Sequence, residues 1–364
     1  MGNTTWMARL IVAASSVAAA FTLVAPNSVF AASAPTKLDV TLGDKCMYNS
    51  TAPNTTFTLV WKNADGTVVE RQDITADGYG YWQFCSAIHR LSAGDTLKAT
   101  NAGGTNVLDV PLLTIAVNRV HNYVSGRAPA GSVVHVHCDG SNGFEPCIWT
   151  RRTRAGVNGY WSQPIGWDVQ GGEPYHVSWK TADGDRVSAY GQAAFVYAEI
   201  GTANVTGAIE ANTLREIDLY DASMNLKGTA TAIGSPRDGG FSAVFRDAHD
   251  QRVDVEPADT IDASAVASDA HFVAPQIEAT ATASTDRLTG QCQDTGTSLG
   301  YADISLYRTG NLVGFAQQGE DGVFDFNFRH LDGGNEANVK VGDRLVVDCV
   351  QDDNDGALLT IYAQ

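Results

Sequence analysis

A short phrase returns four times along this chain, each time at nearly the same spacing. It places an aromatic residue just after a glycine-containing turn, and these anchors lie 79, 80 and 83 residues apart: Trp82, Trp161, Phe241 and Phe324. A glycine at the end of an earlier strand-like stretch has nearly the same period, with spacings of 83, 81 and 83 residues: Gly43, Gly126, Gly207 and Gly290. Two markers with one period predict an internal repeat of about 80 residues.

Each repeat carries the signals of short strands joined by tight turns. Pairs such as Asp77-Gly78 and Asn158-Gly159 supply the positive φ that such turns need. Apolar and polar residues alternate beside them, as in the run Val323–Phe328, and the chain after residue 31 sustains no helical period. Many short strands with frequent turns predict antiparallel β-sandwiches. We expect each unit to close its own core and the short linkers to hold the units in a fairly stiff rod.

The first 31 residues have the pattern of a secretory signal peptide. Arg9 precedes an apolar run that ends in small residues, and cleavage is expected after Ala31. A membrane anchor is the alternative, but the run is short of the roughly 20 apolar residues that a span requires. No later apolar run is long enough to span a membrane. The protein is therefore expected to be secreted, extracellular and free of stable membrane insertion.

Charge is high and unevenly placed. The net charge is −17, so nucleic acid is an unfavourable partner because its phosphates would be repelled. Residues 35–198 contain 14 acidic and 13 basic residues, whereas residues 199–364 contain 27 and 10. The tryptophans after residue 31 all lie in the first of these two segments. The two halves therefore present different surfaces.

The six cysteines fit the repeats. Exported proteins with an even number of cysteines commonly form disulfides. Pairing within a repeat leaves none over and predicts three bonds: Cys46–Cys85, Cys138–Cys147 and Cys292–Cys349. Metal binding by these residues is disfavoured because no CxxC spacing or Cys/His cluster is present.

The glycine-ended first strand, the alternating strand and the phrases ADGYGYW and EDGVFDF resemble those of bacterial Ig-like domains, over essentially all of the chain after residue 31. The resemblance implies an all-β protein of four tandem Ig-like antiparallel β-sandwich domains after an N-terminal signal peptide. The expected boundaries are a signal peptide at 1–31 and domains at 32–115, 116–197, 198–275 and 276–364. It also implies adhesion, spacing or ligand display, with no catalytic residues to transfer.

A string near the start of the fourth repeat, DTGTS at residues 294–298, matches the catalytic motif of pepsin-like aspartic proteases. Such enzymes need two aspartates that share one proton, each on a loop fed by an apolar strand. No second D-[TS]-G occurs in the chain, and the residues before Asp294 are not apolar. We interpret the string as a turn and expect neither enzymatic activity nor a cofactor.

The second repeat contains the strongest candidate contact face. His135 and His137 lie two apart on a predicted strand, so both side chains leave one face, opposite Val134 and Val136. This spacing suits zinc or copper only with a third ligand, which the sequence does not supply. Exposed tryptophan and arginine are enriched in binding surfaces. The complete candidate face is His135, His137, Trp149, Arg151, Arg152, Arg154, Trp167 and Trp179.

An acidic run near the C-terminus, Asp352 to Asp355 followed by Gly356, suggests calcium. It departs from the EF-hand pattern, because Gln351 stands where the first aspartate should be and no glutamate follows at the right distance. An acidic hairpin turn is the main interpretation. Weak calcium binding at this turn or at a seam between domains remains the alternative.

These observations predict an exported, non-enzymatic binding or adhesion protein whose N-terminal half is the contact face. The expected partner is an extracellular glycan or surface protein. Two alternatives stay open: a structural subunit of an extracellular assembly, which would self-associate, and a polysaccharide-binding accessory module that uses Trp167 or Trp179 to stack on sugar rings.

Overall fold

The computed structural model describes residues 36–138, 149–293, 299–318, 323–327, 338–351 and 354–364. Within them the protein is all-β and contains no helix. The predicted signal peptide, Asp294 with its DTGTS string, Cys147, Asp352 and Asp353 lie outside the described residues. Each sequence repeat contributes seven strands to the described part of the chain.

Repeat 1 contains β1 (Asp39–Thr41), β2 (Cys46–Ser50), β3 (Thr56–Lys62), β4 (Val68–Thr75), β5 (Tyr81–Cys85), β6 (Thr96–Asn101) and β7 (Gly104–Asp109). Repeat 2 contains β8 (Ala116–Asn118), β9 (Tyr123–Arg127), β10 (Val133–Cys138), β11 (Trp149–Arg154), β12 (Tyr160–Pro164), β13 (Pro174–Lys180) and β14 (Arg186–Gln192). Repeat 3 contains β15 (Phe195–Glu199), β16 (Asn204–Ala208), β17 (Leu214–Tyr220), β18 (Leu226–Ile233), β19 (Gly240–Val244), β20 (Thr260–Asp262) and β21 (His271–Val273). Repeat 4 contains β22 (Gln276–Thr282), β23 (Arg287–Gln293), β24 (Leu299–Arg308), β25 (Asn311–Gln318), β26 (Val323–Asn327), β27 (Arg344–Gln351) and β28 (Gly356–Tyr362).

The repeats are joined in pairs by backbone hydrogen bonds. Strand β1 of repeat 1 runs parallel to β14 of repeat 2, and β15 of repeat 3 runs parallel to β28 of repeat 4. The other ladders between named strands are antiparallel, as the alternating pattern predicts. In repeats 3 and 4 the result is one seven-stranded sheet, in the order β19-β16-β15-β28-β27-β24-β25. The corresponding strands of repeats 1 and 2 form two sheets, β2-β5 and β1-β14-β13-β10-β11.

Burial follows the same pairing. Buried apolar side chains form one cluster between Leu38 and Ala193 and a second between Val196 and Ala363. Each cluster therefore spans two repeats, so the buried side chains of the two repeats in a pair are continuous. The expectation that every unit closes a core of its own stays a prediction. Parallel pairing between the edge strands of two repeats, β1 with β14 and β15 with β28, brings their buried side chains together, while β15 keeps its antiparallel pairing with β16 of its own repeat. The four domain boundaries stay a prediction.

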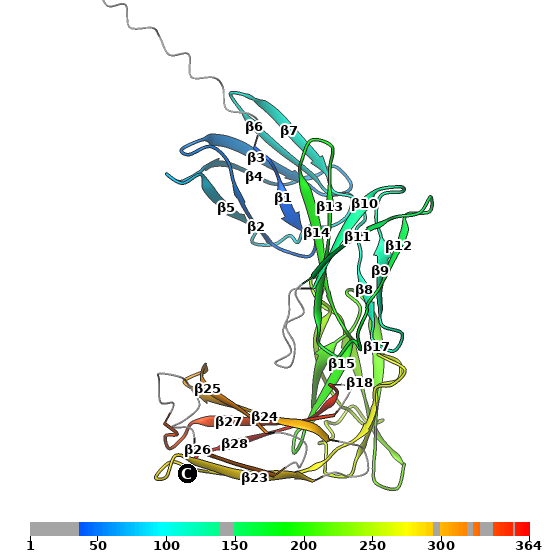
Figure 1. Ribbon diagram of the computed structural model, residues 1–364, viewed down its shortest axis with the longest axis vertical. Coiled ribbons are helices and arrows are strands. Elements are labelled where there is room, and N and C mark those ends of the chain that lie inside the picture. Colours follow the sequence, from blue (N-terminus) through cyan, green and yellow to red (C-terminus); the bar gives the residue numbers. More distant parts are fainter. Residues whose placement is uncertain (1–35, 139–148, 294–298, 319–322, 328–337, 352–353) are drawn as a thin grey trace, which may run out of the picture.

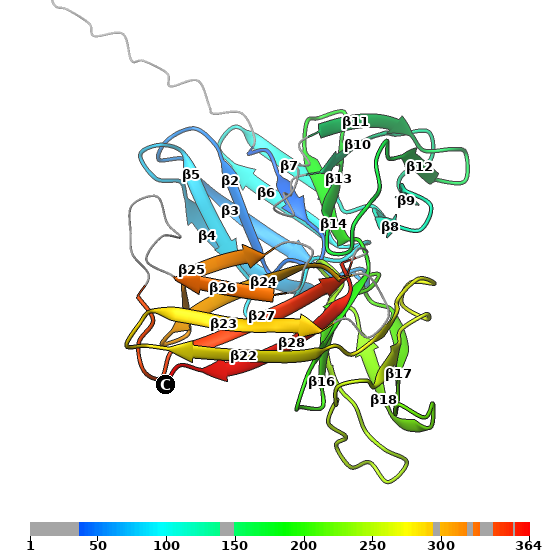
Figure 2. The ribbon, with the colours of Figure 1, turned by 60° about the horizontal axis from the view of Figure 1, so that its bottom comes forward.

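Figure 1 shows that the four repeats do not lie along one line. The stiffness expected from their short linkers stays a prediction. Repeats 2 and 3 follow one another along the long axis, while repeats 1 and 4 project from them toward the same side. Figure 2 shows the same arrangement from a second direction, with β22 and β23 of repeat 4 in front. The parallel strand pairings contribute to this shape, because each of them places two consecutive repeats side by side.

The repeated glycine and aromatic anchors face each other across a strand pair. The register places the glycine opposite the ring in three repeats, where a Cβ would collide with that ring: Gly126 with Trp161, Gly207 with Phe241 and Gly290 with Phe324. Repeat 1 differs, because Asn49 lies opposite Trp82. Gly43, which the spacing grouped with the other three, instead has φ of 80° in a turn packed against the backbone of Pro236 in repeat 3.

A second recurring element precedes β6, β13, β20 and β27. A residue with positive φ is followed by a buried acid whose backbone N–H donates to the carbonyl three residues earlier. These pairs are Gly94-Asp95, Gly172-Glu173, Ala258-Asp259 and Gly342-Asp343, with φ of 91°, 78°, 71° and 86°. In three of them the acid also accepts a hydrogen bond from the N–H three residues earlier, on Ser92, Glu256 and Lys340. The backbone bond thus closes the corner in every repeat, and the side-chain bond adds to it in three of them.

Ala258 is the only alanine among these four corner residues, and replacing it with glycine is expected to stabilise repeat 3 by about 1 kcal/mol. A Cβ disfavours the left-handed backbone region, whereas glycine occupies it freely. The matched reverse change is Gly342→Ala, because φ is 86° and nothing lies within 4 Å of the added Cβ. It should destabilise repeat 4 by a similar amount. Urea unfolding of both variants checks this prediction, and equal midpoints for all proteins would contradict it.

Candidate binding face

The candidate face lies on the sheet β1-β14-β13-β10-β11. Its inner side carries Val134 and Val136, both fully buried. His135 and His137 point to the outer side, because alternate residues of a strand face opposite ways. The structure adds a third histidine from β13, since His176 lies directly opposite His137. His176 was not predicted from the sequence. The signal that could have identified it is its position between Tyr175 and Val177, two apolar residues of the same strand that alternate with it and are buried.

The outer side carries a row of stacked rings. The imidazoles of His135 and His137 have centroids 6.3 Å apart, and those of His137 and His176 are 4.2 Å apart with 15° between their planes. Tyr190 of β14 continues the row, 5.3 Å from His176. At the other end, Nδ1 of His137 lies 2.8 Å from Oγ1 of Thr150 on β11. The row therefore crosses four strands of the sheet.

Basic side chains lie beside this row. Arg152 lies opposite His135, and Arg154 lies opposite Val133. Lys180 of β13 faces Arg186 of β14, whose guanidinium is 3.4 Å from the carboxylate of Asp39. We call this surface the His–Arg face; it consists of His135, His137, Arg152, Arg154, His176, Lys180, Arg186 and Tyr190. It is a basic surface on a protein of net charge −17.

The predicted contact residues do not all join this face. Trp149 and Arg151 pair with Cys138 and Val136 and therefore belong to the inner side of the sheet, where Arg151 lies 5.5 Å from the Trp149 ring. Trp179 lies between Val134 and Val187 in the register and packs against the core. Trp167 remains 36% exposed, and its ring makes an edge contact with Trp149 at 5.6 Å. The structure thus separates the tryptophans from the histidines.

Electrostatics keep His135 in its neutral form at pH 7. Burial lowers the pKa of His135, and the positive charges of Arg152 and Arg186 lower it further. The three imidazoles do not form a chelating set, because the nitrogen lone pairs lie in the ring planes and stacked rings cannot direct them to one ion. Within the residues that the structure describes, no cluster of three or more His, Cys, Asp or Glu side chains could hold a metal ion.

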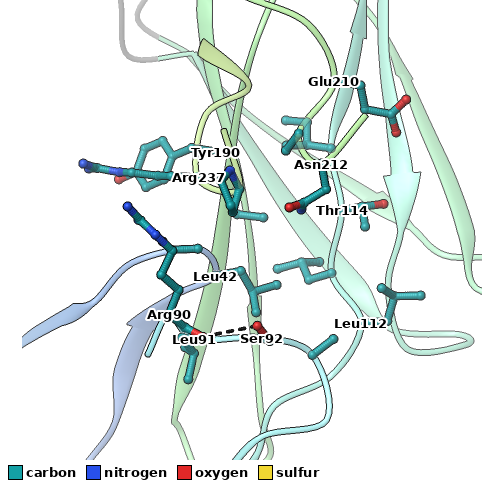
Figure 3. A pocket seen from close by; sticks show the side chains of 17 residues that line it. Leu42, Arg90, Leu91, Ser92, Leu112, Thr114, Tyr190, Glu210, Asn212 and Arg237 are labelled. Atoms are coloured by element: carbon teal, nitrogen blue, oxygen red, sulfur yellow. Dashed lines mark hydrogen bonds between the residues drawn. The ribbon is translucent and has the colours of Figure 1, made fainter. Parts of the chain in front are cut away.

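The ring row ends at a cavity where three repeats meet. Its volume is about 290 Å³, and its lining includes Leu42 and Arg90 of repeat 1, Tyr190 of repeat 2 and Arg237 of repeat 3. Figure 3 shows the guanidinium groups of Arg90 and Arg237 pointing to the same side of this cavity, with Arg237 beside the Tyr190 ring. Arg237 lies 5.6 Å from that ring centroid and 3.0 Å from the carboxylate of Asp44. These contacts extend the basic surface from repeat 2 to repeat 3.

One aspartate of the acidic turn, Asp355, makes contacts within the protein. Asp355 is fully buried, and its Oδ2 lies 2.6 Å from Nη2 of Arg119, which is itself only 4% exposed. Its Oδ1 accepts a 2.6 Å hydrogen bond from the backbone N–H of Val196. Arg119 also donates to Asp269 at 3.0 Å. Both oxygens of Asp355 are therefore engaged in a buried ion pair that ties repeat 2 to repeats 3 and 4.

The carboxylates of Asp355 and Asp269 keep the guanidinium of Arg119 protonated despite its burial. Burial alone would lower the pKa of Arg119, but Asp355 and Asp269 together hold that pKa above its ordinary value. The arginine is therefore fully charged in the folded protein. No sequence signal marked Arg119, because its partners lie 150 and 236 residues away.

Two of the predicted disulfides are present, Cys46–Cys85 and Cys292–Cys349. Cys138 is buried and disulfide-bonded, and its predicted partner Cys147 lies outside the described residues. The first bond joins directly opposed residues of β2 and β5. The bond therefore links the two strands of the two-stranded sheet β2-β5 covalently.

No protein-family model matches the sequence, and no curated protein matches it. Among solved structures, a tetra-tandem repeat in the extending region of a large adhesion protein is 16% identical, with a TM-score of 0.18; the match covers 90% of this chain and 99% of that one. The FN1–FN3 domains of chicken CNTN1 are 9% identical, with a TM-score of 0.20 and coverage of 91% and 99%. A 1.5-MDa bacterial ice-binding adhesin is 12% identical, with a TM-score of 0.17 and coverage of 91% and 98%. At such TM-scores these similarities say nothing about how this protein acts.

None of the described residues belongs to a helix that could cross a lipid bilayer.

Proposed function

We propose that this protein is an exported, non-catalytic binding protein of the adhesion type, assembled from bacterial Ig-like repeats. The signal-peptide pattern of residues 1–31 and the two disulfides Cys46–Cys85 and Cys292–Cys349 support export to an oxidising compartment. The N-terminal half is the contact half. The more acidic C-terminal half, held to it through Arg119, acts as a support.

The observation that carries this proposal is the position of the His–Arg face. Positive charge gathers on one face of a single sheet, while the protein as a whole carries −17. Such a face attracts a negatively charged partner and orients the protein toward it, with the acidic half turned away. A ligand rich in sulfate or carboxylate groups, such as an acidic extracellular polysaccharide, matches this charge.

His135 makes this attraction dependent on pH. His135 is neutral at pH 7 because its pKa lies below its ordinary value. As the pH falls, its imidazole gains a proton beside Arg152, and the positive charge of the face rises. The affinity for an anionic ligand should therefore increase as the pH falls from 7 to 5.

Binding of the intact protein to immobilised dextran sulfate tests the proposal, with uncharged dextran as the reference surface. The double variant Arg152→Glu/Arg154→Glu is expected to lose at least tenfold in affinity, because two attractive charges become repulsive. The matched control, Lys62→Glu/Lys98→Glu, makes the same change in charge on exposed residues of repeat 1 and should retain affinity. Equal losses in the two variants would show that only net charge matters and would contradict the assigned face.

An assembly subunit is the remaining alternative, and the same preparation tests it. Analytical ultracentrifugation over a hundredfold range of concentration should show one monomeric species. Growth of the sedimentation coefficient with concentration would favour the assembly role over the binding role.

A further inference from the structure

Strands β2 and β5 of repeat 1 carry a second, separate surface feature. A hollow of about 580 Å³ is lined by residues of these two strands and the turn before β5: Tyr48, Asn49, Ser50, Asp77, Tyr81, Trp82 and Gln83. Figure 2 shows β2 and β5 on repeat 1, away from β10, β11 and β13, which carry much of the His–Arg face. The hollow is therefore independent of the site proposed above.

Its walls are aromatic and strongly exposed. Tyr48 is 63% exposed and Tyr81 is 66% exposed. Ser50 lies opposite Tyr81 and Gln83 opposite Tyr48, so the two tyrosines are diagonal neighbours on one face of the strand pair. Tyr79, on the turn before β5, is 86% exposed. Several large rings left in solvent on one small sheet indicate a surface that gains a partner, because such rings bury 150–250 Å² each when covered.

Polar side chains between the rings have oxygen atoms that can still form hydrogen bonds with a ligand. Oδ1 of Asp77 accepts hydrogen bonds from the N–H groups of Tyr79 and Tyr81, at 2.8 and 2.9 Å, and so fixes the turn. Three other oxygens of the lining accept or donate no hydrogen bond within the described part of the chain: Oδ2 of Asp77, Oγ of Ser50 and Oε1 of Gln83. The lining contains no lysine or arginine. Acceptors and hydroxyls without positive charge suit a neutral ligand that is rich in hydroxyl groups.

The hollow is also held rigidly. The Cys46–Cys85 disulfide joins the two strands beside Tyr48 and Gln83. Trp82, which also borders the hollow, is buried and makes an edge contact with Phe57 at 5.1 Å. A site on strands fixed by a covalent bond and a packed ring requires little ordering when a ligand binds.

We propose that this hollow binds a neutral glycan, with Tyr48 and Tyr81 stacking against sugar rings. The apolar C–H faces of a pyranose ring pack on the aromatic faces, while Ser50, Asp77 and Gln83 hydrogen-bond to its hydroxyl groups. The exposed tyrosines thus take the role that sequence reasoning gave to Trp167 and Trp179. Those tryptophans are less suitable for stacking on a sugar, because Trp179 packs against the core and the ring of Trp167 makes an edge contact with the ring of Trp149.

Isothermal titration calorimetry of the intact protein with cellohexaose, maltohexaose and laminarihexaose tests this inference. At least one of these neutral oligosaccharides is expected to bind, and Tyr48→Ala/Tyr81→Ala should weaken that binding at least tenfold. Tyr48→Phe/Tyr81→Phe keeps both rings and should bind within about threefold of the parent. The matched control, Tyr160→Ala/Tyr362→Ala, removes two exposed tyrosines elsewhere and should leave binding unchanged.

Binding of none of the three oligosaccharides, or equal binding by the Tyr48→Ala/Tyr81→Ala variant and the parent, overturns the inference. Circular dichroism of that variant establishes that it is folded before either result is read. The outcome is separable from that of the His–Arg face, because Arg152→Glu/Arg154→Glu should leave oligosaccharide binding intact and the tyrosine variant should still bind dextran sulfate.

Discussion

Replacing Arg119 with leucine is expected to lower the free energy of unfolding of the C-terminal half by about 3–5 kcal/mol. The change leaves Asp355 fully buried without the guanidinium that lies 2.6 Å from it. An uncompensated buried charge is far more costly than an absent ion pair. The two halves have separate cores, so each should remain folded while their fixed relative orientation is lost. Urea unfolding gives the first quantity, and small-angle X-ray scattering detects the second as a larger radius of gyration.

A double variant separates the ion pair from mere loss of packing. Arg119→Leu/Asp355→Asn removes both charges while keeping an oxygen to accept the Val196 N–H, and should recover much of the lost stability. Arg186→Leu is the matched control, because its pair with Asp39 is exposed and should contribute less than about 1 kcal/mol. If Arg119→Leu and Arg186→Leu cost the same, the buried pair does not lock the halves.

Replacing Asp348 with asparagine is expected to stabilise the C-terminal half at pH 8 by about 3–4 kcal/mol and to leave it nearly unchanged at pH 4. Asp348 of β27 lies directly opposite Asp303 of β24. Burial raises the pKa of Asp348 to about 7, with the charge of Asp303 adding to the effect, and burial raises the pKa of Asp303 to about 6. Oδ1 of each is buried without a hydrogen-bond partner in the described part of the chain.

The sign follows from proton binding. Between pH 4 and pH 7 the folded state holds protons on these two carboxyl groups that the unfolded state has released, so stability falls as the pH rises through this range. The groups opposite the pair in the neighbouring strands are Leu358 on β28 and Gln317 on β25, neither of which carries a charge. Asparagine resembles the protonated acid and removes the penalty above pH 7. Thermal unfolding between pH 4 and pH 8 measures it.

The exposed pair partner Asp325 provides the control for this pH dependence. Asp325 accepts hydrogen bonds from Arg287, which lower its pKa. Its contribution is lost only in strong acid, so Asp325→Asn should show no gain at pH 8. A parent protein whose stability is flat between pH 4 and pH 8 would falsify the assignment to Asp303 and Asp348.

The sequence determined the local architecture of this protein. Alternation and Asp-Gly or Asn-Gly turns specify strands and hairpins, because side-chain period and turn geometry depend only on neighbouring residues. The same alternation placed His135 and His137 opposite the buried Val134 and Val136. The aromatic anchors were identified in all four repeats, and two intra-repeat disulfides were paired correctly, since the period of about 80 residues assigns each cysteine to a unit.

Only the tertiary structure decided which edge strands pair with one another. A strand edge offers the same backbone N–H and C=O groups to any extended segment, so nothing local shows that β1 pairs with β14 or β15 with β28. Those two pairings join the buried side chains of the repeats in pairs. The tertiary structure also brings Arg119 to Asp355 and leaves Tyr48 and Tyr81 around an open hollow. Such features depend on residues that the chain separates by tens to hundreds of positions, and long-range backbone pairing alone places them together.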